Sequence, residues 1–581
     1  MISNLIFRHL LCIATLLMAS CGTQTPDDNG TDKPSGTPAV EITLGTITET
    51  TVEATLNFTN GEVCYWAVLP AGESVASGYA LKKVGKAINA SGSIIAEGLT
   101  RGKSYTLYAA AARGDEYGKV VSAEFTTQKI ITTLPAKGWQ TTADKRKLFE
   151  AITIADESAA PASSRVITLN DAVTYQTIDG WGPAITGSTC YNLLLMDQRD
   201  RTNLLREVFD PVEGMNYSFI RISIGCSDFS LEEYTCCDTP GIENWQFPEL
   251  DERDLLPILR EIYAINPNVK IVAAPWTCPK WMKLAVNSNA PHDKWTSGRL
   301  NPAYYDDYAT YFVKWIKYME SKGFPIYAVS PQNEPLNHGN SASLYMPWDH
   351  QRDFVGKHLG PAFEQNGIET QIWAYDHNFD VPDYVKNIYK STSAKYFDGS
   401  AWHAYGGNKS VLGDIHKAAP EKGIYFTEQS IGTWCPNFGD NLMWTMRAIC
   451  IGTVNLHCKA VLFWNFLLDA NRGPNRPNGG CTTCYGFVDF VDGGHKTLNR
   501  RSHYYSIAHM SKVAQPDALR IGSSIDQSTG GVSFTAFLNP DGTHSIVVLN
   551  EGKAQRFIVE DGKGGSFSFE AAERSVSSII W

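Results

Sequence analysis

Beyond its first twenty residues, the 581-residue sequence has no apolar run as long as the ~18 residues that a transmembrane helix needs. It also lacks a basic excess, since 50 Lys and Arg stand against 61 Asp and Glu, with no basic cluster. These absences argue against a second membrane span and against a nucleic-acid partner. No Gly-rich phosphate fingerprint follows the first strand of the predicted α/β region, which argues against a dinucleotide domain.

Cysteine is present but lacks the paired spacing of a zinc site. Of the 13 cysteines, Cys481 and Cys484 form a C-x-x-C pattern, and no second pair has matching spacing. A disulfide or two packed thiols is therefore the better interpretation, and we expect no metal and no cofactor. Setting aside Cys12 and Cys21 leaves an odd number, so at least one thiol stays free outside the cytosol.

The first twenty residues have an unusual composition. Residues 1–20 have Arg8 as their only charge and contain the run LLCIATLLMAS, directly before Cys21. This segment resembles a bacterial lipoprotein signal, in which residues 1–20 are removed as a signal peptide and Cys21 is lipidated. Met18 departs from the usual lipobox, and a simple secretory signal with an incidental cysteine is the alternative.

The polar stretch after Cys21 bears on localisation. Asp27 and Asp28 resemble the signal that sends some lipoproteins of the Bacteroides group to the outer face of the cell. The resemblance implies an outer-membrane, lipid-anchored protein at the cell surface, with the periplasm or secretion as alternatives. Residues 21–38 are rich in Pro, Gly, Asp and Thr, so we expect a lipidated flexible tether.

Residues 39–128 read as short alternating strands separated by turn residues, which predicts a small β-sandwich. The phrase GLTRGKSYTLYAAA resembles the tyrosine-bearing strand of fibronectin type III domains, so we expect a fibronectin type III-like β-sandwich. A spacer is the default role of this domain, and carbohydrate binding is the alternative. Residues 129–165, which contain DESAAPASS, are expected to be a connector.

Strands alternate with helices over residues 180–500. One helix begins at Asn301 and Pro302 and ends at Gly323. Eight buried-strand candidates, with helical segments between them, predict an α/β fold with a closed (β/α)8 TIM barrel. They are QTIDGWGPA, YSFIRISIG, VKIVAAPW, IYAVSPQNE, TQIWAYD, FDGSAWHAY, GIYFTEQS and AVLFWNF. Strand alternation returns over 501–581 and predicts a C-terminal β-domain.

Two glutamates end barrel strands. Glu334 closes the fourth strand and Glu428 the seventh, and polar groups at the carboxyl ends of barrel strands form the active site. Two carboxylates about 5–5.5 Å apart across a sugar hydrolyse a glycoside with retention, one as nucleophile and one as acid. Taken singly, either glutamate is equally compatible with a surface residue or an ion pair.

The neighbouring motifs carry a family resemblance. QTIDGWGPAITGSTCYNL, RISIGCSDFSLEEYT, AAPWTCPKWMK, SPQNEP, WHAY and FTEQSIG occur in the order found in glycoside hydrolase family 30, which includes glucosylceramidases and β-1,6-glucanases. The resemblance covers residues 166–581 and implies that Glu334 is the acid/base, Glu428 the nucleophile and Asn333 a ligand of the sugar 2-hydroxyl. It also implies that residues 166–179 complete the C-terminal β-domain.

Further residues gain roles from their positions. His403 and Tyr405 lie two apart on a strand and share a face, so Tyr405 is placed to donate to Glu428. Asp228 matches a carboxylate that holds sugar hydroxyls in the family, and Trp276 and Trp464 offer flat rings to a pyranose. The structural alternatives are buried core groups for His403 and Tyr405 and a loop cap for Asp228.

The resemblance implies a retaining β-glycoside hydrolase acting on a polysaccharide, most similar to the bacterial endo-β-1,6-glucanases. Glucosylceramidase or xylanase activity is the enzymatic alternative, and the loop GPNRPNGGCTTCYG departs from the family where specificity is set. A non-catalytic surface glycan-binding lipoprotein is the alternative of another class. We expect a monomer.

Overall fold

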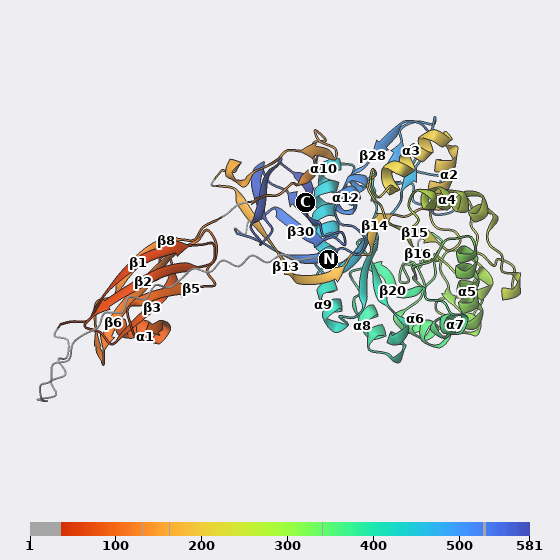
Figure 1. The fold of residues 1–581 in the computed structure, drawn as a ribbon. Helices are drawn as coiled ribbons and strands as arrows, with labels where there is room; N and C mark the ends of the chain where they lie inside the picture. The colour runs from red at the N-terminus through yellow and green to blue at the C-terminus, as the bar shows by residue number, and fades with distance from the viewer. Residues whose placement is uncertain (1–35, 130–131, 162, 340, 527–529) are drawn as a thin grey trace, which may run out of the picture. The chain divides into compact units, whose positions relative to one another are not determined.

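The computed structural model describes residues 36–129, 132–161, 163–339, 341–526 and 530–581, and divides into two compact units, Met1–Ile130 and Ile131–Trp581 (Figure 1). The predicted signal peptide, Cys21 and most of the 21–38 tether lie outside the described residues. In the described part of the chain, no helix has the length and apolarity needed to cross a bilayer.

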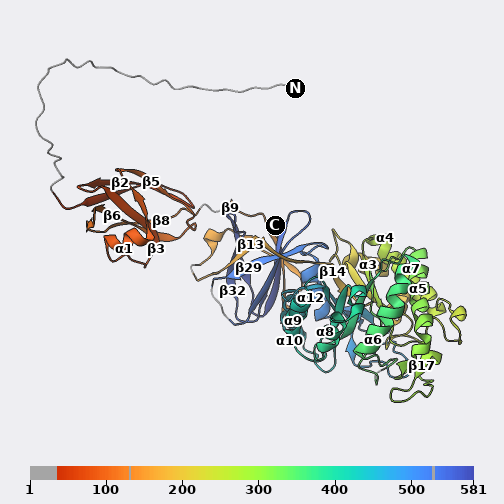
Figure 2. The same cartoon turned by 90° about the horizontal axis from the view of Figure 1, so that it is seen from below.

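The first unit is a two-sheet β-sandwich, as predicted (Figure 2). One sheet has the order β1-β2-β5 and the other β4-β3-β6-β7, with β8 paired to β6. The Tyr105 hydroxyl accepts the Thr100 backbone N–H at 2.9 Å, which is the corner expected of the tyrosine-bearing strand. The elements are β1 Ala39–Ile47, β2 Val52–Thr59, β3 Val63–Pro70, α1 Gly78–Val84, β4 Lys86–Ile88, β5 Gly92–Ala96, β6 Ser104–Arg113, β7 Glu116–Tyr117 and β8 Val121–Thr126.

The second unit contains the predicted eight-stranded parallel barrel. Its order is β14-β24-β22-β21-β20-β19-β16-β15, and a parallel bridge between Ala184 and Arg221 closes the ring. All eight predicted strands are present. They are β14 Gly180–Pro183, β15 Phe219–Ser223, β16 Lys270–Ala274, β19 Ala328–Val329, β20 Gln371–Asn378, β21 Gly399–His403, β22 Gly423–Glu428 and β24 Cys458–Phe463.

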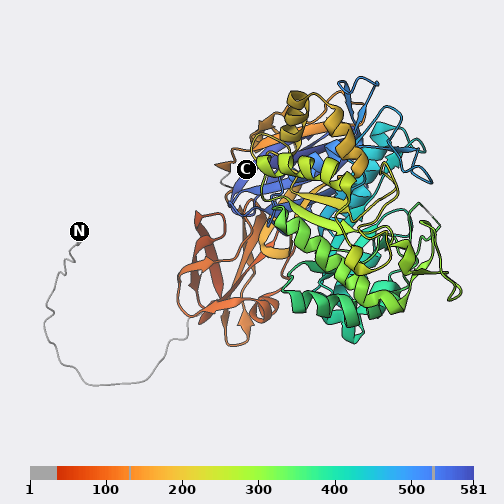
Figure 3. The ribbon, with the colours of Figure 1, turned by 90° about the vertical axis from the view of Figure 1, so that its right-hand side faces the viewer.

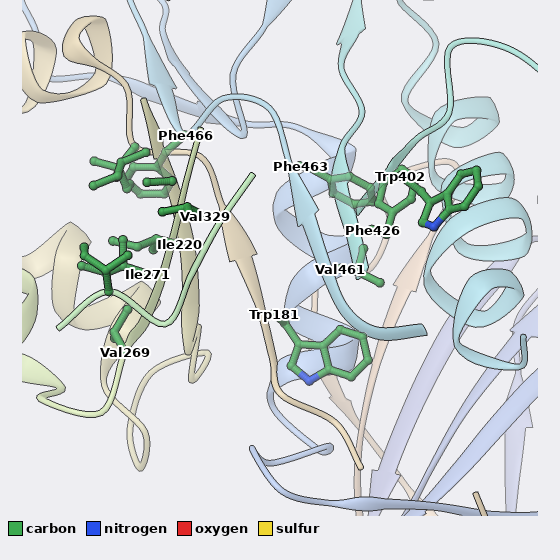
Figure 4. Packing of buried hydrophobic residues seen from close by; sticks show 14 of the residues in the cluster. Trp181, Ile220, Val269, Ile271, Val329, Trp402, Phe426, Val461, Phe463 and Phe466 are labelled. Atoms are coloured by element: carbon green, nitrogen blue, oxygen red, sulfur yellow. The ribbon is translucent and has the colours of Figure 1, made fainter. Parts of the chain in front are cut away.

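The barrel strands are apolar on both faces because one face fills the barrel and the other packs against helices. Phe219, Trp373 and Tyr425 belong to the interior cluster. Their neighbours face the helices, and Figure 4 shows two such groups. These groups are Ile220, Ile271 and Val329 on one side, and Trp402, Phe426 and Phe463 on the other.

Helices surround the barrel, and those coloured yellow-green and green are seen in Figure 3. The predicted helix is confirmed, since the Asn301 side chain accepts the Ala303 N–H and Gly323 adopts φ 91° beyond its end. The α-helices are α2 Gly187–Leu195, α3 Gln198–Phe209, α4 Leu256–Ile265, α5 Tyr305–Ser321, α6 Trp348–Phe354, α7 Gly360–Asn366, α8 Asp383–Tyr389, α9 Val411–Ala418, α10 Phe438–Thr445, α11 Ile451–Val454 and α12 Ser502–Ser511. π-Helical turns at Asp251–Leu255, Val355–Leu359 and Met446–Cys450 continue into α4, α7 and α11.

The C-terminal β-domain is one large sheet built from both sides of the barrel sequence. Strand β13 pairs antiparallel with β29 and parallel with β32, so residues 166–179 complete it as expected. The full order is β11-β10-β34-β31-β30-β29-β13-β32-β33-β12, with β9 on β33. The strands are β9 Thr132–Thr133, β10 Lys137–Thr142, β11 Glu150–Ile152, β12 Ile154–Ala155, β13 Arg165–Thr177, β29 Leu519–Ile525, β30 Val532–Leu538, β31 His544–Asn550, β32 Gln555–Glu560, β33 Gly565–Ala571 and β34 Ser575–Ile580.

Two predicted boundaries are wrong. Residues 129–165 are not a connector, because β10 pairs with β34 and buries Gln140, whose side chain donates to Ser577. Several buried residues of β10 are polar and form hydrogen bonds within the sheet. Their sequence therefore lacks the alternation of apolar and polar residues that predicts a strand. Residues 502–514 belong to the barrel rather than to the C-terminal domain, since Trp181 of β14 donates to the Ala514 carbonyl at 2.8 Å.

Long loops at the carboxyl ends of the barrel strands form short sheets of their own. Strands β17 Lys283–Leu284 and β18 Arg299–Leu300 pair, as do β23 Ile431–Gly432 and β26 Cys484–Tyr485. Strand β27 Val488–Phe490 lies between β25 Leu467–Leu468 and β28 Leu498–Arg500. Cys481 and Cys484 form a disulfide, as one of the sequence interpretations held.

The amino ends of the strands are joined by a separate ion cluster. Asp179, which precedes β14, contacts the ammonium of Lys270 at 3.0 Å and that of Lys459 at 3.1 Å. The Asp179 side chain is 6% exposed, and the two lysines are about a quarter exposed. One carboxylate therefore links three barrel strands at the end opposite the predicted site.

Candidate active site

The two predicted catalytic glutamates meet at the carboxyl ends of the strands. Glu428 is the last residue of β22, and Glu334 follows β19 in a left-handed conformation with φ 45°. They are 6% and 8% exposed. His403 Nδ1 lies 3.3 Å from Glu334 Oε1 and 4.0 Å from Glu428 Oε1, so one atom approaches both carboxylates. This proximity favours the short spacing of retaining glycosidases.

Arg221 is the buried cation at the centre of the site. It lies on the interior face of β15, two residues beyond Phe219, and is fully buried. Its guanidinium donates to Glu428 Oε2, to Asn333 Oδ1 at 2.7 Å and to Asp376 Oδ2 at 2.8 Å. A charge buried in this way is stable only when it is paired and hydrogen-bonded, as Arg221 is.

Asp376 reaches the interior through an irregularity in β20. The pairing with β21 shifts between Tyr375 and His377, and Tyr375 and Asp376 have φ values of 78° and 64°. This bulge turns Asp376 into the barrel, although simple alternation from Trp373 would have placed Tyr375 there. Asp376 accepts hydrogen bonds from Arg221, His403 and Thr427, and these lower its pKa against the effect of burial.

His403 links the two ends of this network. Its Nε2 lies 3.0 Å from Asp376 Oδ1, and its Nδ1 faces Glu334. Burial lowers the pKa of His403, but the charges of Glu428 and Asp376 and its hydrogen bonds outweigh burial and raise the pKa to about 9. His403 therefore holds two protons at neutral pH and donates to both Asp376 and Glu334.

The catalytic glutamates have opposite pKa shifts in this site. Burial raises the pKa of Glu334, but the hydrogen bond and charge of His403, with His377 and Asn337, lower it overall. For Glu428, burial and the charge of Glu334 raise the pKa more than His403 and Arg221 lower it. In the free site the negative charge is thus favoured on Glu334.

Asn333 and Tyr405 take the predicted positions. Arg221 only donates hydrogen bonds, so the contact fixes Asn333 Oδ1 toward Arg221 and leaves its Nδ2 as a donor for a substrate hydroxyl. The Tyr405 hydroxyl donates to Glu428 Oε1 at 3.0 Å as expected, although β21 ends at His403 and Tyr405 lies two residues beyond the strand. Tyr405 is 44% exposed, so it forms part of the wall.

The two predicted stacking residues are more buried than expected. Trp276 and Trp464 are 5% and 2% exposed, and their rings stack with centroids 5.0 Å apart. The Arg221 guanidinium lies 4.9 Å from the Trp276 ring and 5.6 Å from the Trp464 ring. Both rings thus pack against Arg221, and little of their faces remains for a sugar.

Asp228 lies in the loop after β15, close enough to the glutamates to be influenced by them. Burial, followed by the charges of Glu428 and Glu334, raises its pKa to about 8. Its Oδ1 is buried without a partner. A largely protonated carboxyl with an unused oxygen is suited to exchange hydrogen bonds with a sugar hydroxyl, as the family resemblance implied.

The comparisons with known proteins agree with this geometry. The family described as glycosyl hydrolase family 30 TIM-barrel domain matches residues 178–514, and its β-sandwich domain matches 517–579. The chain belongs to glycoside hydrolase family 30. This family 30 chain is 31% identical over 426 residues to the endo-1,6-β-D-glucanase neg1 of Aspergillus fumigatus, covering 70% of this chain and 85% of the relative.

The family 30 chain is also similar to a glucosylceramidase and to a glucanase of known structure. It is 26% identical over 500 residues to the lysosomal acid glucosylceramidase of Mus musculus, covering 80% of this chain and 93% of the relative. Among solved structures, the endo-β1,6-glucanase BT3312 is 48% identical with a TM-score of 0.74, covering 77% of this chain and 99% of that one. The sequence-based family assignment is thereby confirmed.

Three polar residues of this family 30 site were missed from the sequence. They are Arg221, Asp376 and Asn337, which donates to Glu334 Oε2 at 2.7 Å. A charged residue inside the apolar run FIRISIG, and another at the end of IWAYD, were signals for Arg221 and Asp376. The bulge in β20 left no sequence pattern that would show which way Asp376 points.

Ligand atoms of Glu334, His377 and His403 lie within 4.8 Å of one another, which is compatible with a divalent ion. The hydrogen bonds of His403 to Glu334 and Asp376 account for this grouping without one, because both ring nitrogens already face carboxylates. The absence of a metal stays a prediction.

Proposed function

We propose that this retaining glycosidase is an endo-β-1,6-glucanase. The main support for the substrate assignment is the 48% identity to the endo-β1,6-glucanase BT3312 across nearly all of that chain. The fungal endo-1,6-β-D-glucanases of Aspergillus fumigatus and Trichoderma harzianum, at 31% and 33% identity, support the same linkage. The chemistry rests on Glu334 and Glu428, which share His403.

In the first step, Glu428 attacks the anomeric carbon and Glu334 protonates the leaving oxygen. The free site favours charge on Glu334, so the proton must first reach it. A shift from His403 Nδ1 to Glu334 Oε1, 3.3 Å apart, supplies it and leaves His403 neutral with Nε2–H still bound to Asp376. Once Glu334 is neutral, its charge no longer raises the pKa of Glu428, and Arg221 and Tyr405 donate hydrogen bonds to the Glu428 carboxylate that attacks.

In the second step, Glu334 acts as the base. Glu428 has become an ester and its negative charge has gone, so the pKa of Glu334 falls and the carboxylate can take a proton from water. Attack on the same face restores the β-configuration of the product. Asn333 Nδ2 is placed to donate to the 2-hydroxyl in both transition states.

Product stereochemistry and substrate range test the proposal. Proton NMR of the first-formed product from β-1,6-glucan should show the β-anomer, and a 2-fluoro glucoside with a good leaving group should label Glu428. An α-anomer would overturn the mechanism. Cleavage of xylan or glucosylceramide but not of β-1,6-glucan would overturn the substrate and leave the mechanism in place. Binding of glucan without release of reducing sugar would support a non-catalytic glycan-binding protein.

We further propose that the protein is anchored in the outer membrane through Cys21 and faces a polysaccharide outside the cell. The support is the apolar segment before Cys21 and the acidic pair after it. A Cys21→Ala variant should lose metabolic lipid labelling and move to the soluble fraction, whereas Cys12→Ala should not. Unchanged fractionation of the Cys21 variant would contradict the anchor.

A further inference from the structure

A groove of about 630 Å³ lies beside Glu428, lined by Gln429 and Ser430, which directly follow it, and extends to residues next to the C-terminal sheet. At its inner end it is lined by Tyr405 and Ser430, and farther out by Trp434 and Trp444. Glu551 and Arg574, which flank strands β31 and β34, form its outer end. The groove is thus built by both parts of the second unit.

The groove is continuous with the catalytic centre through one side chain. The Tyr405 hydroxyl donates to Glu428 Oε1 and to Ser430 Oγ, while the residue is 44% exposed and lines the groove. Tyr405 therefore contacts the Glu428 carboxylate with its hydroxyl and lines the groove with its exposed surface.

Two tryptophans give the groove its exposed apolar surface. Trp434 and Trp444 are 56% and 37% exposed, and they are the most exposed tryptophans among the described residues. Flat aromatic faces are suited to the C–H face of a pyranose, which is apolar while its edge carries hydroxyls. Trp276 and Trp464, in contrast, are occupied with Arg221.

Trp434 is held in position rather than free to turn inward. A Cβ at Gly432 would lie 2.2 Å from Cζ3 of the Trp434 ring and 2.4 Å from the Thr483 carbonyl oxygen. Only glycine at this place lets the indole lie against the backbone. Strand β23, which ends at Gly432, pairs with β26, and the disulfide of Cys484 closes the turn before that strand.

The charged groups of the groove are paired. Arg447 contacts Glu551, and Arg574 contacts Asp440 at 2.6 Å. Two cations and two anions leave no excess of either sign, so the groove offers hydrogen-bonding groups without attracting a polyanion. This lining is suited to a neutral glycan.

We propose that this groove binds further glucosyl units of the chain that is cleaved between Glu334 and Glu428, with Trp434 and Trp444 as stacking surfaces. The inference rests on the proposed function and deepens it, because cleavage within a chain requires binding sites for units beyond the reacting bond. It also assigns a role to the loop GPNRPNGGCTTCYG, in which Thr483 and Cys484 pair with Thr433 and Gly432, the residues before Trp434.

Chain-length dependence tests the groove. Trp434→Ala, Trp434→Phe and Trp444→Ala would be compared on β-1,6-linked oligosaccharides of increasing length and on an aryl β-glucoside. For Trp434→Ala, the ratio of kcat/KM on long chains to that on the aryl glucoside should fall on the order of tenfold, a loss typical of one stacking contact. Trp434→Phe should retain most of the ratio. Tyr79→Ala, equally exposed at 54% but in the first unit, is the matched control.

The outcomes separate the groove from the proposed function. If the protein cleaves β-1,6-glucan but Trp434→Ala and Trp444→Ala keep the wild-type dependence on chain length, the groove proposal is wrong and the function stands. If β-1,6-glucan is not cleaved, but Trp434→Ala changes the length dependence on the glucan that is cleaved, the linkage is wrong and the groove stands. An equal loss of kcat/KM on long chains and on the aryl glucoside would also overturn the groove proposal.

Discussion

The two ends of the barrel each contain a buried charge cluster, and they differ in how their charges are balanced. At the amino ends, Asp179 meets two lysines whose side chains are about a quarter exposed. At the carboxyl ends, Arg221 and His403 face Asp376, Glu334 and Glu428, and all five are at least nine-tenths buried. The first cluster has one acid and two bases, whereas the second has three acids and two bases.

The difference shows which end can do chemistry. The ion pairs of the amino-end cluster connect strands β14, β16 and β24. In an acid-rich buried cluster the protons have more than one place to reside, and a small change in surroundings moves them. Activity should therefore depend on the carboxyl end and stability on the amino end.

The largest effect should come from Glu428→Gln. This variant removes the nucleophile, and we expect kcat to fall by at least about a thousandfold. Its stability should be unchanged or higher, because one of the mutually repelling buried acids has become neutral. Kinetics with a purified variant and thermal unfolding would measure both. A loss of stability as well as activity would contradict the assignment of activity to the carboxyl end and stability to the amino end.

Glu334→Gln should have a smaller and substrate-dependent effect. Hydrolysis of the polysaccharide should slow by about a hundredfold or more, since the leaving oxygen needs a proton. An aryl glycoside with an acidic phenol needs none in the first step, so its glycosylation should be much less affected. Burst kinetics with the aryl glycoside would show the difference, and an equal slowing of both substrates would argue against Glu334 as the acid.

Asp179→Asn tests the opposite end. It removes the charge shared by Lys270 and Lys459, and we expect a loss of about 1–3 kcal/mol in the free energy of unfolding of the barrel unit. The kcat should remain within about twofold of wild type, because the cluster lies at the far end of the strands. Denaturant unfolding and steady-state kinetics provide the readouts. A large fall in kcat with unchanged stability would contradict the assignment.

His403 predicts a pH dependence of stability. Its pKa is raised to about 9 in the folded protein, so its contribution is complete below its unfolded pKa of about 6.5 and is lost as pH rises through 9. The slope is at most about 1.4 kcal/mol per pH unit. A His403→Gln variant should flatten the decline in unfolding temperature between these values. An unchanged slope would show that His403 is not the group that titrates.

The sequence was sufficient for the barrel and for placing Glu334 and Glu428 at the carboxyl ends of its strands because both leave short-range signals. Buried strands read as apolar runs, and Glu334 and Glu428 stand at the ends of two of them. Family resemblance added Asn333 and the nucleophile's role, which no spacing shows. The barrel strands and the two glutamates can be predicted from local sequence patterns and from their order along the chain.

What could not be predicted depends on tertiary contacts. The bulge that turns Asp376 inward, and the exposure of Trp434 over Gly432, follow from backbone conformations that neighbouring strands impose. Trp276 and Trp464 are buried because both pack against Arg221, which belongs to a different strand. The sequence around each tryptophan gives no sign of this contact. Strand β10 was missed because its buried residues are polar and are satisfied only by the distant strand β34.

The shared C-terminal sheet has a consequence for synthesis of the chain. Strand β13 is made before the barrel, but its partner β29 follows it, with Ile167 opposite Ile525. At about 5–20 residues per second, the intervening roughly 350 residues take tens of seconds to translate, during which β13 has no partner strand from the C-terminal side. Folding of this unit therefore cannot finish from the N-terminus, and a chain truncated after the barrel should expose an unpaired strand edge and aggregate.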